Sequence, residues 1–427
     1  MRSRWMTLSI ALATALMLML PVLALAQTSR VQGLGIQGDY IKDYTGMYTY
    51  PSNITGVGNL MYGEFGSGGN TPSDKAVGSV MDKLFDGRFG TWGVHLRQFT
   101  PQLGQGDNTS QPSPGTGGAD PNFNGNEGFD IMWGHKSGTT SFGLRLDRSF
   151  VKFEDQVPGI TTKLAFDPNA FSNNLGRNIM GYGAGVGFQL NPQTDVDLAA
   201  QLQTRTYENS LTNNHKNTDN GSTTYQLAAR AMMHWKPNVM LVPVIKFSSY
   251  DLSEKLDATP GGGALTQFDN TMSAWQLGVS TDWTMGTNDL IVWGLTFAQN
   301  KVDENENLFG LAPPPNSTIN FANHVVITES FMPQLFAALE THVNNWLTLR
   351  FGANEGMFES LKYEDKVTGE TAQTSRSTFA MDLGAGVKVG SLQFDATMSP
   401  NFFQNLGWVG SGIANSYFPK VTATYAF

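Results

Sequence analysis

The chain has 427 residues, of which 40% are hydrophobic and 11% aromatic, and its formal net charge is −9 at pH 7. This acidic balance argues against nucleic-acid binding, which uses a basic face, and the lack of cysteine excludes disulfides, thiolate metal sites and a lipid-modified N-terminal cysteine. A soluble chain of this length usually divides into several domains, whereas a closed barrel with lipid on its outer face escapes this limit.

The first 26 residues have the features of a cleaved secretory signal peptide. Arg2 and Arg4 precede an apolar run over residues 6–23, and Ala24-Leu25-Ala26 supplies the small residues of a cleavage site. The alternative is an uncleaved membrane anchor, because the run is almost long enough to span a bilayer. Residues 27–427 contain no comparable run, so a membrane-bound form of the mature chain has to be a closed barrel.

Residues 27–87 lack the regular pattern of the remaining chain. Residues 27–56 show no strand periodicity, and residues 57–65 are compatible with one strand. Between Ser73 and Phe85 the apolar residues recur at helical spacing, with Gly87 just beyond the end, which predicts a short helix. The alternative is a hairpin that turns at Asp86-Gly87. The helix leaves fourteen strands in the chain, and the hairpin raises the number to sixteen.

From residue 89 onward the two-residue period of a strand recurs. The predicted strands cover residues 89–99, 128–136, 139–150, 177–190, 193–208, 222–235, 238–250, 271–285, 288–302, 324–340, 343–361, 376–389, 391–404 and 415–427. Tight turns alternate with long polar connections at 100–127, 151–176, 209–221, 251–270, 303–323, 362–375 and 405–414. Short turns at one rim and long connections at the other indicate a barrel of the outer-membrane type.

Apolar and charged residues alternate along these strands, which assigns the apolar side to lipid and the charged side to the interior. Leu144 and Leu146, for example, alternate with Arg145 and Asp147. Tryptophans near strand ends predict aromatic girdles at Trp235, Trp275, Trp283, Trp293 and Trp346. The candidate ligand contacts in the interior are His95, Arg97, Arg145, Arg205, Arg230, His234, Lys246 and Arg350.

Two roles are open for these basic side chains. They can hold the carboxylate of a ligand, or set a transverse field against inward acidic residues. Alternatively, they pair with acidic residues of neighbouring strands and keep the wall or the plug in register. Met232, Met240 and Val242 are the apolar inward positions expected to contact the tail of a ligand.

Both ends of the chain resemble known bacterial proteins. At the C-terminus, Val421, Ala423, Tyr425 and Phe427 share one face of a strand, which resembles the assembly signal of outer-membrane β-barrels. This resemblance implies that the barrel-assembly machinery is a partner.

The N-terminal segment resembles the entry to the long-chain fatty acid transporter family. The resemblance rests on Arg30, Leu34-Gly35, Asp43 and Tyr50-Pro51-Ser52, the last of which stands where the family has Asn-Pro-Ala. It implies that the segment folds as a hatch inside a fourteen-stranded barrel, and the alternative is a flexible periplasmic leader.

The same resemblance implies a lateral exit for apolar ligand at a kinked strand. Pro243 and Pro333 are the candidates, because proline cannot donate to a strand ladder. The alternative at both positions is a bulge without a transport role.

One connection has part of a calcium-loop pattern. Asp120, Asn122 and Asn124 place oxygen ligands at alternate positions, and Asp130 is the candidate for the closing acidic ligand. The alternative is an ordinary surface loop rich in Asx and Gly residues. No nucleophile elbow, zinc-protease motif or phosphate-binding loop occurs, so we expect no enzyme.

The sequence therefore predicts an all-β, antiparallel transmembrane barrel of about fourteen strands, or alternatively sixteen, in the outer membrane. The predicted organisation is a signal peptide at 1–26, a plug with a short helix at 27–87 and the barrel at 88–427. The predicted function is passive uptake of small hydrophobic or amphipathic compounds. The alternatives are a porin for polar solutes and a structural or secretion-accessory barrel that conducts nothing. The expected partners are the lipid bilayer, the assembly machinery and a small-molecule substrate, without nucleic acid.

Overall fold

The computed structural model describes residues 29–66, 75–82, 84, 88–97, 127–154, 172–211, 216–219, 223–251, 253–257, 266–286, 289–307, 322–398 and 420–427. The predicted signal peptide at 1–26 lies outside the described residues, as do Asp120, Asn122 and Asn124. None of the helices in these ranges is long and apolar enough to cross a membrane.

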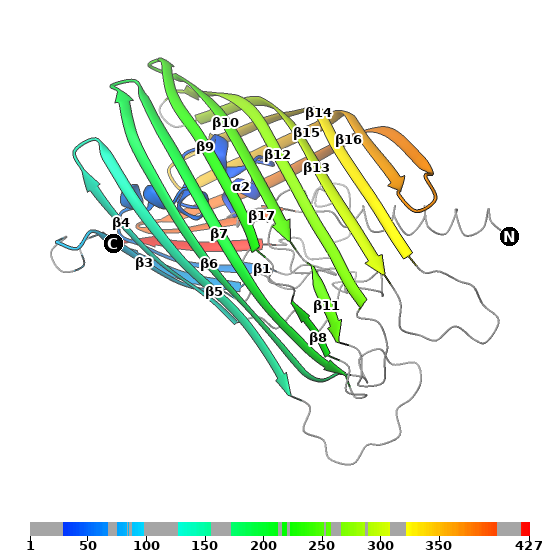
Figure 1. The fold of residues 1–427 in the computed structure, drawn as a ribbon. Coiled ribbons are helices and arrows are strands. Elements are labelled where there is room, and N and C mark those ends of the chain that lie inside the picture. The colour runs from blue at the N-terminus through cyan, green and yellow to red at the C-terminus, as the bar shows by residue number, and fades with distance from the viewer. Residues whose placement is uncertain are drawn as a thin grey trace, which may run out of the picture.

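Tilted antiparallel strands form the wall of a barrel (Figure 1). The strands are β1 (Leu60–Gly66), β2 (Lys75–Met81), β3 (Thr91–Arg97), β4 (Glu127–Ser137), β5 (Thr140–Glu154), β6 (Ser172–Asn191), β7 (Thr194–Leu211), β9 (Thr223–Lys236), β10 (Val239–Asp251), β12 (Thr266–Met285), β13 (Asp289–Asn307), β14 (Ala322–His342), β15 (Leu347–Asp365), β16 (Thr371–Val389), β17 (Leu392–Met398) and β18 (Lys420–Ala426). Two short strands, β8 (Lys216–Asp219) and β11 (Glu254–Asp257), lie between β7 and β12 and extend the wall at the long-connection end.

The wall closes because its first and last strands pair. β1 pairs with β18 from Leu60 opposite Ala426 to Gly66 opposite Lys420, and its other edge pairs with β2. With β8 and β11 counted as extensions, the described strands form a closed ring of sixteen. Closure gives every strand two neighbours, as a sheet exposed to lipid requires. The preferred number of fourteen strands is wrong, and the alternative of sixteen is confirmed.

The predicted helix within residues 73–85 is also wrong, because Lys75–Met81 form strand β2. Its apolar residues fit a helical spacing, but β1 lies along one edge of the strand and β3 along the other. Spacing alone cannot distinguish a short apolar strand from a helix, and here pairing with distant strands decides. β1 and β2 belong to the wall, although the sequence assigned both to the plug.

Two of the predicted long connections are partly strand, and a third is shorter than predicted. β8 and β11 fall within the predicted loops at 209–221 and 251–270. In place of a loop at 362–375, β15 continues to Asp365 and β16 begins at Thr371. The backbone N–H groups of Val367 and Thr368 donate to Asp365 Oδ1 and fix the tight turn.

The wall is irregular beside Pro333. The β13–β14 register shifts between Thr296 and Ala298, and the β15–β16 register shifts between Gly356 and Glu359. This confirms the bulge predicted at Pro333. At Pro243 the pairing of β10 with β12 is continuous, but its pairing with β9 is interrupted between Leu241 and Val244 without a change of register. A role of Pro333 in a lateral exit stays a prediction.

The irregularity reverses which residues face the interior. On β14, Glu340 is buried at an even-numbered inward position, but beyond the bulge the buried residue is Glu329. On β15 the buried inward positions likewise change from Arg350 to Glu359. Alternation continued across the bulge would assign both distal glutamates to the lipid side.

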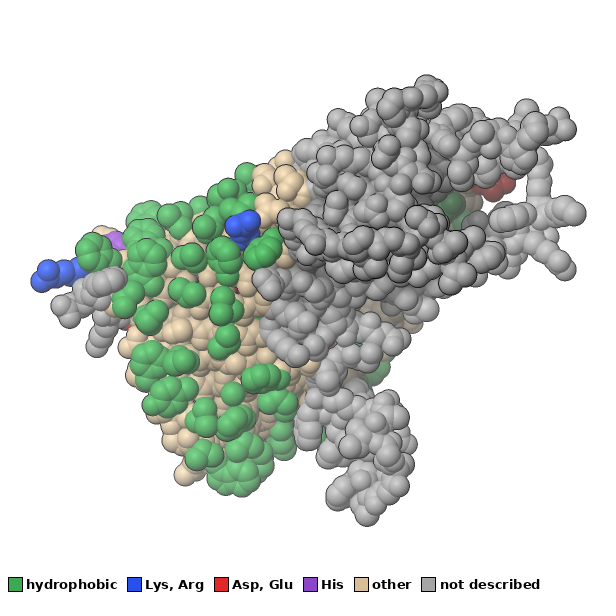
Figure 2. All heavy atoms as spheres, turned by 90° about the horizontal axis from the view of Figure 1, so that it is seen from below, with side chains coloured by type: hydrophobic (Ala, Val, Ile, Leu, Met, Phe, Trp, Pro, Cys, Tyr) green, Lys and Arg blue, Asp and Glu red, His purple; other side chains and the backbone are tan. Residues whose placement is uncertain are grey.

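The outer face of the barrel is apolar. Hydrophobic side chains spread over the described part of the face in Figure 2, and charged ones are sparse there. Exposed examples on neighbouring strands are Leu144, Tyr182, Leu202 and Leu227. The tryptophans exposed near the short turns are Trp235, Trp283, Trp293 and Trp346, as predicted, while Trp275 lies farther along β12 opposite Gln299.

Residues 29–57, which we call the inner segment, lie within the ring of strands (Figure 1). They form α2 (Ser29–Gly33), the 3₁₀ turn η1 (Gly38–Tyr40), α3 (Gly46–Thr49) and the 3₁₀ turn η2 (Pro51–Gly56). α2 contacts β15 to β18, and η2 contacts β3 to β6 on another side of the wall. The inner segment therefore spans the interior from one side to the other.

Candidate functional site in the barrel interior

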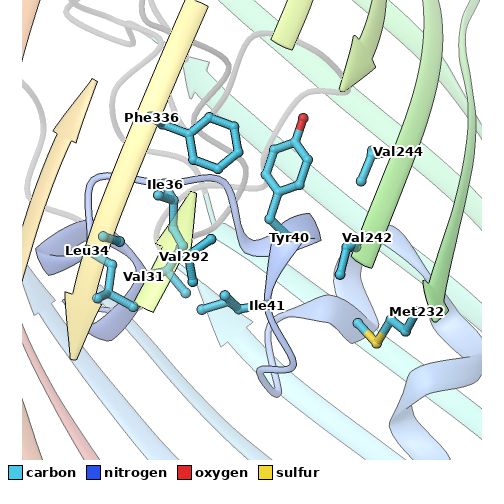
Figure 3. Close-up of a cluster of buried hydrophobic side chains, with 11 residues drawn as sticks. Val31, Leu34, Ile36, Tyr40, Ile41, Met232, Val242, Val244, Val292 and Phe336 are labelled. Carbon is cyan, nitrogen blue, oxygen red and sulfur yellow. The ribbon is translucent and has the colours of Figure 1, made fainter. Parts of the chain in front are cut away.

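An apolar cluster joins the inner segment to the wall (Figure 3). The rings of Tyr40 and Phe336 pack with their centroids 4.7 Å apart. The other members from the inner segment are Val31, Leu34, Ile36 and Ile41, and those from the wall are Met232, Val242, Val244, Val292 and Ala338. Met232 and Val242 were expected to contact a ligand, as was Met240, which packs against this cluster. In this structure the inner segment covers that apolar surface.

Glycines on the wall let the backbone of the inner segment approach closely. A Cβ at Gly352 would lie 2.0 Å from the carbonyl oxygen of Leu34, and one at Gly143 would lie 2.1 Å from the carbonyl carbon of Pro51. Both separations are far below van der Waals contact, so a larger residue would displace the inner segment. β15 and β5 carry these glycines, which places a docking point on two different sides of the barrel.

A chain of ion pairs fixes the start of the inner segment. Arg30 donates from Nη1 to Asp43 Oδ2 at 3.0 Å and from Nη2 to Glu340 Oε1 at 2.8 Å. Arg350 donates from Nε to the other oxygen of Glu340 at 2.6 Å and from Nη1 to Asp395 at 2.7 Å. Burial alone would lower the pKa of Arg30, but the hydrogen bonds and charges of Glu340 and Asp43 raise it above its usual value. Glu340 is thus shared by two buried guanidinium groups.

A second polar contact fixes the middle of the segment. Lys246 Nζ donates to the carboxylate of Asp39, and Arg230 Nη1 donates to the carbonyl oxygen of Asp39 at 3.0 Å. Arg230 Nε also donates to Asp197 on β7 at 2.8 Å, and its guanidinium lies 4.5 Å from the ring centroid of Tyr50. Both wall cations are therefore committed to the inner segment.

A third contact surrounds Tyr48. The guanidinium of Arg97 lies 3.9 Å from its ring centroid, and that of Arg145 lies 5.5 Å away. The Tyr48 carbonyl accepts hydrogen bonds from Arg145 Nη1 at 3.1 Å and from Gln201 Nε2 at 2.8 Å. Burial raises the pKa of Tyr48 to about 12, so its hydroxyl stays protonated and hydrogen-bonds to Tyr62.

Ion pairs with acidic side chains involve five of the predicted basic residues: Arg97, Arg145, Arg230, Lys246 and Arg350. His95 is fully buried, and its ring contacts Tyr48 of the inner segment. Arg205 is buried on β7, and His234 is exposed next to a short turn. The contacts of the five ion-paired residues are those of the second predicted role, in which basic side chains pair with acidic residues of the wall or the plug.

Asp130 is the one residue of the calcium pattern that the structure describes, and its side chain is buried on the inner face of β4. Its Oδ1 accepts from Arg145 at 2.7 Å, and its Oδ2 pairs with Arg97 Nε at 2.9 Å. The two arginines occupy the carboxylate, and the described residues contain no group of three or more His, Asp or Glu suited to a metal ion. A calcium site in the connection would therefore have to form without Asp130.

Beyond the inner segment, toward the long connections, the inner wall becomes apolar. One cluster crosses β13 to β15 and a second crosses β10, β12 and β13. Their members are Tyr250, Met272, Val302, Val325, Ile327, Leu361 and Tyr363. The buried Glu329 and Glu359 lie beside them, and we call all these residues together the distal wall.

Sequence reasoning missed the part of the distal wall on β14 and β15 because of the bulge at Pro333. Glu329 and Glu359 occupy odd-numbered positions, whereas Glu340 and Arg350 mark the even-numbered inward positions before the bulge. The proline was the available signal, since it predicts an interrupted ladder. Its position does not show how many residues the bulge adds.

The described strands form a closed ring with an apolar exterior and an interior lined by buried ion pairs and amides. A water-soluble barrel has the opposite arrangement, whereas a barrel that crosses lipid requires this one. The protein is an outer-membrane β-barrel.

No protein-family model matches the sequence, and no curated protein matches it. Among solved structures, it is similar to the toluene transporter TodX of P. putida, at 8% identity and a TM-score of 0.35 over 95% of this chain and 99% of that chain. A TodX deltaS2 mutant, described as a monoaromatic hydrocarbon channel, is 10% identical with a TM-score of 0.41 over 93% and 96%. The translocator domain of the autotransporter NalP from Neisseria meningitidis is 11% identical with a TM-score of 0.29 over 69% and 90%. At these identities and TM-scores the matches carry no argument about the family, role or substrate of this chain.

Proposed function

We propose that this protein is a channel for passive uptake of small hydrophobic or amphipathic compounds across the outer membrane. The observation that carries the proposal is the distal wall, an apolar stretch of inner surface at the long-connection end. A water-filled porin has a polar interior and gains nothing from such a stretch. In the proposal, a compound that enters between the long connections contacts this apolar surface first.

The inner segment is the plug in this proposal. Its contacts with the wall support that role, because they include an apolar cluster, two close glycine contacts and ion pairs at Arg30 and Asp39. Breaking one partner of a buried ion pair costs about 3–5 kcal/mol, so the segment does not leave its place at thermal energies. Compounds would then pass by a path along the wall.

A porin for polar solutes is the weaker candidate. Its selectivity would depend on charged side chains at a constriction. Arg145, Arg230, Lys246 and Arg350 already pair with acidic residues or bind the inner segment. Among the described residues, these side chains therefore serve the docking of the inner segment.

The test compares the mature chain from residue 27 with a variant that lacks residues 27–57. This deletion keeps β1 and β2, so the ring of strands stays complete. Single-channel conductance in planar bilayers should show a closed intact protein and large steady steps for the variant. Uptake of a hydrophobic aromatic dye should be faster into liposomes that contain the intact protein than into protein-free liposomes.

Two outcomes contradict the proposal in different ways. Stable ohmic steps from the intact protein would mean that the inner segment is no plug, and the porin would take its place. An intact protein that neither conducts nor accelerates dye uptake would be a barrel without transport function.

A further inference from the structure

We propose that the distal wall selects amphiphiles with a cationic, hydrogen-bond-donating head group, such as an alkylammonium ion, which Glu329 and Glu359 bind. The inference rests on the proposed function and assigns a ligand class to it. Its basis is two buried glutamates, Glu329 on β14 and Glu359 on β15, with one arginine, Arg376 on β16, beside them. Apolar side chains of β13 to β15 lie next to this group.

Glu359 has one buried carboxylate oxygen without a hydrogen-bond donor. Its side chain is 2% exposed, and Oε1 accepts a hydrogen bond from Arg376 Nε at 2.8 Å. Oε2 is buried without a hydrogen-bond partner. A buried acceptor without a donor costs free energy, more so when it is charged, and a ligand that donates a hydrogen bond removes that cost.

Glu329 adds a second carboxyl group nearby. It faces Leu361 in the register, while Glu359 faces Phe331 two residues along, so the glutamates are diagonal neighbours on adjacent strands. Asn300 Nδ2 lies 3.5 Å from Glu329 Oε2, a long hydrogen bond that brings no charge. Asn300 therefore brings no positive charge to the two glutamates.

The basic side chains around this pair do not balance it. Arg376 is the cation that contacts Glu359, and its side chain is 42% exposed, so water screens its charge. Lys246, the inward lysine of β10, is committed to Asp39 of the inner segment. The described part of the distal wall thus holds two buried carboxyl groups and one partly solvated guanidinium. A carboxylate head group would be repelled here, whereas a monocation would neutralise the site.

The apolar residues provide the place for the tail of such a ligand. Leu361 pairs with Glu329 across the strands, and Ile327 and Tyr363 form the next inward pair. The apolar cluster of β13 to β15 contains Leu361, Ile327 and Tyr363. A ligand whose head lies at the carboxylates can therefore extend its chain along this cluster toward the long connections.

The test uses the full mature protein in detergent and three probes of equal chain length: hexylammonium, hexan-1-ol and hexanoate. We expect hexylammonium to bind about tenfold more tightly than hexan-1-ol, because a charge-assisted hydrogen bond adds about 1.4 kcal/mol or more. Hexanoate should bind most weakly. The preference for ammonium should shrink in high salt, as for any pair of charges in contact with water.

Glu359→Gln should abolish the ammonium preference by lowering the affinity for hexylammonium to that for hexan-1-ol. Glu364→Gln, an outward substitution on the same strand, is the matched control and should preserve the preference. Glu329→Gln is the second variant, which keeps the test decisive if the first one fails to fold.

Equal binding of all three probes, or an ammonium preference that survives both glutamate substitutions, would overturn this inference and leave the proposed function intact. Failure of even hexan-1-ol to bind would instead overturn the proposed function, because the apolar surface itself would be inactive.

Discussion

The two ends of the barrel interior use charge in different ways. Around the inner segment, cations and carboxylates balance, as at Glu340, which receives hydrogen bonds from both Arg30 and Arg350. On the distal wall, Glu359 has one arginine partner and an oxygen without any. In both regions the charged side chains point into the barrel interior. Buried charge in the first region thus fixes a piece of the chain, and in our proposal the buried charge of the second region binds a ligand.

One substitution made at both places gives the largest expected contrast. Glu340→Gln removes the carboxylate shared by Arg30 and Arg350, and we expect the free energy of unfolding to fall by about 3 kcal/mol. Glu359→Gln should change it by less than about 1 kcal/mol, because its partner Arg376 is partly solvated. Urea unfolding in lipid vesicles, followed by tryptophan fluorescence, measures both values.

Glu364→Gln provides the baseline for this pair, since Glu364 contacts Lys362 and Lys366 at the surface and should tolerate the change. Equal losses at Glu340 and Glu359 would show that both regions are structural, and the contrast between them would disappear.

Close packing of the inner segment gives the next largest effect. Gly352→Val places a side chain where the Leu34 carbonyl now lies, and overpacking of this kind costs about 2 kcal/mol. Because the clash is with backbone, the inner segment should shift, and planar bilayers should show a leak conductance that the parent protein lacks.

The matched control for this substitution is Ala353→Val, which adds volume at the next residue of β15, on the opposite face. A closed channel with Gly352→Val would mean that the inner segment adapts without opening a path. The close approach of its backbone would then have no role in gating.

The wall was largely predictable from sequence, because each strand carries its own two-residue pattern. His95 and Arg97 are buried while Leu96 between them is exposed, as the alternation predicts. β2 was not predictable in this way, because its apolar spacing also fits a helix and its partners β1 and β3 decide its structure. The choice between fourteen and sixteen strands therefore depends on strand pairing, because the local pattern fits both a helix and a hairpin.

The contacts of the inner segment were the least predictable part. Arg30 could be named from its resemblance to a family motif, but its partner Glu340 lies 310 residues away in the sequence. Alternation shows that Glu340 faces inward, and many inward carboxylates satisfy that condition. The inward orientation of Glu329 and Glu359 was harder still to predict. The size of the bulge cannot be read from the sequence, and the bulge reverses which residues of β14 and β15 face inward.

The smallest effect that sharpens the comparison concerns two tyrosines, one in each region. Tyr48→Leu removes the ring that lies 3.9 Å from the guanidinium of Arg97 and 5.5 Å from that of Arg145, which should cost about 1 kcal/mol of unfolding free energy. Tyr48→Phe keeps the ring and loses the hydroxyl contact with Tyr62, so it should cost less than Tyr48→Leu. Tyr363→Leu keeps an apolar side chain on the distal wall and should change stability by less than about 0.5 kcal/mol, while weakening hexan-1-ol binding. If Tyr363→Leu destabilises the barrel as much as Tyr48→Leu does, the distal wall is packing surface, and its apolar character serves the fold in place of a ligand.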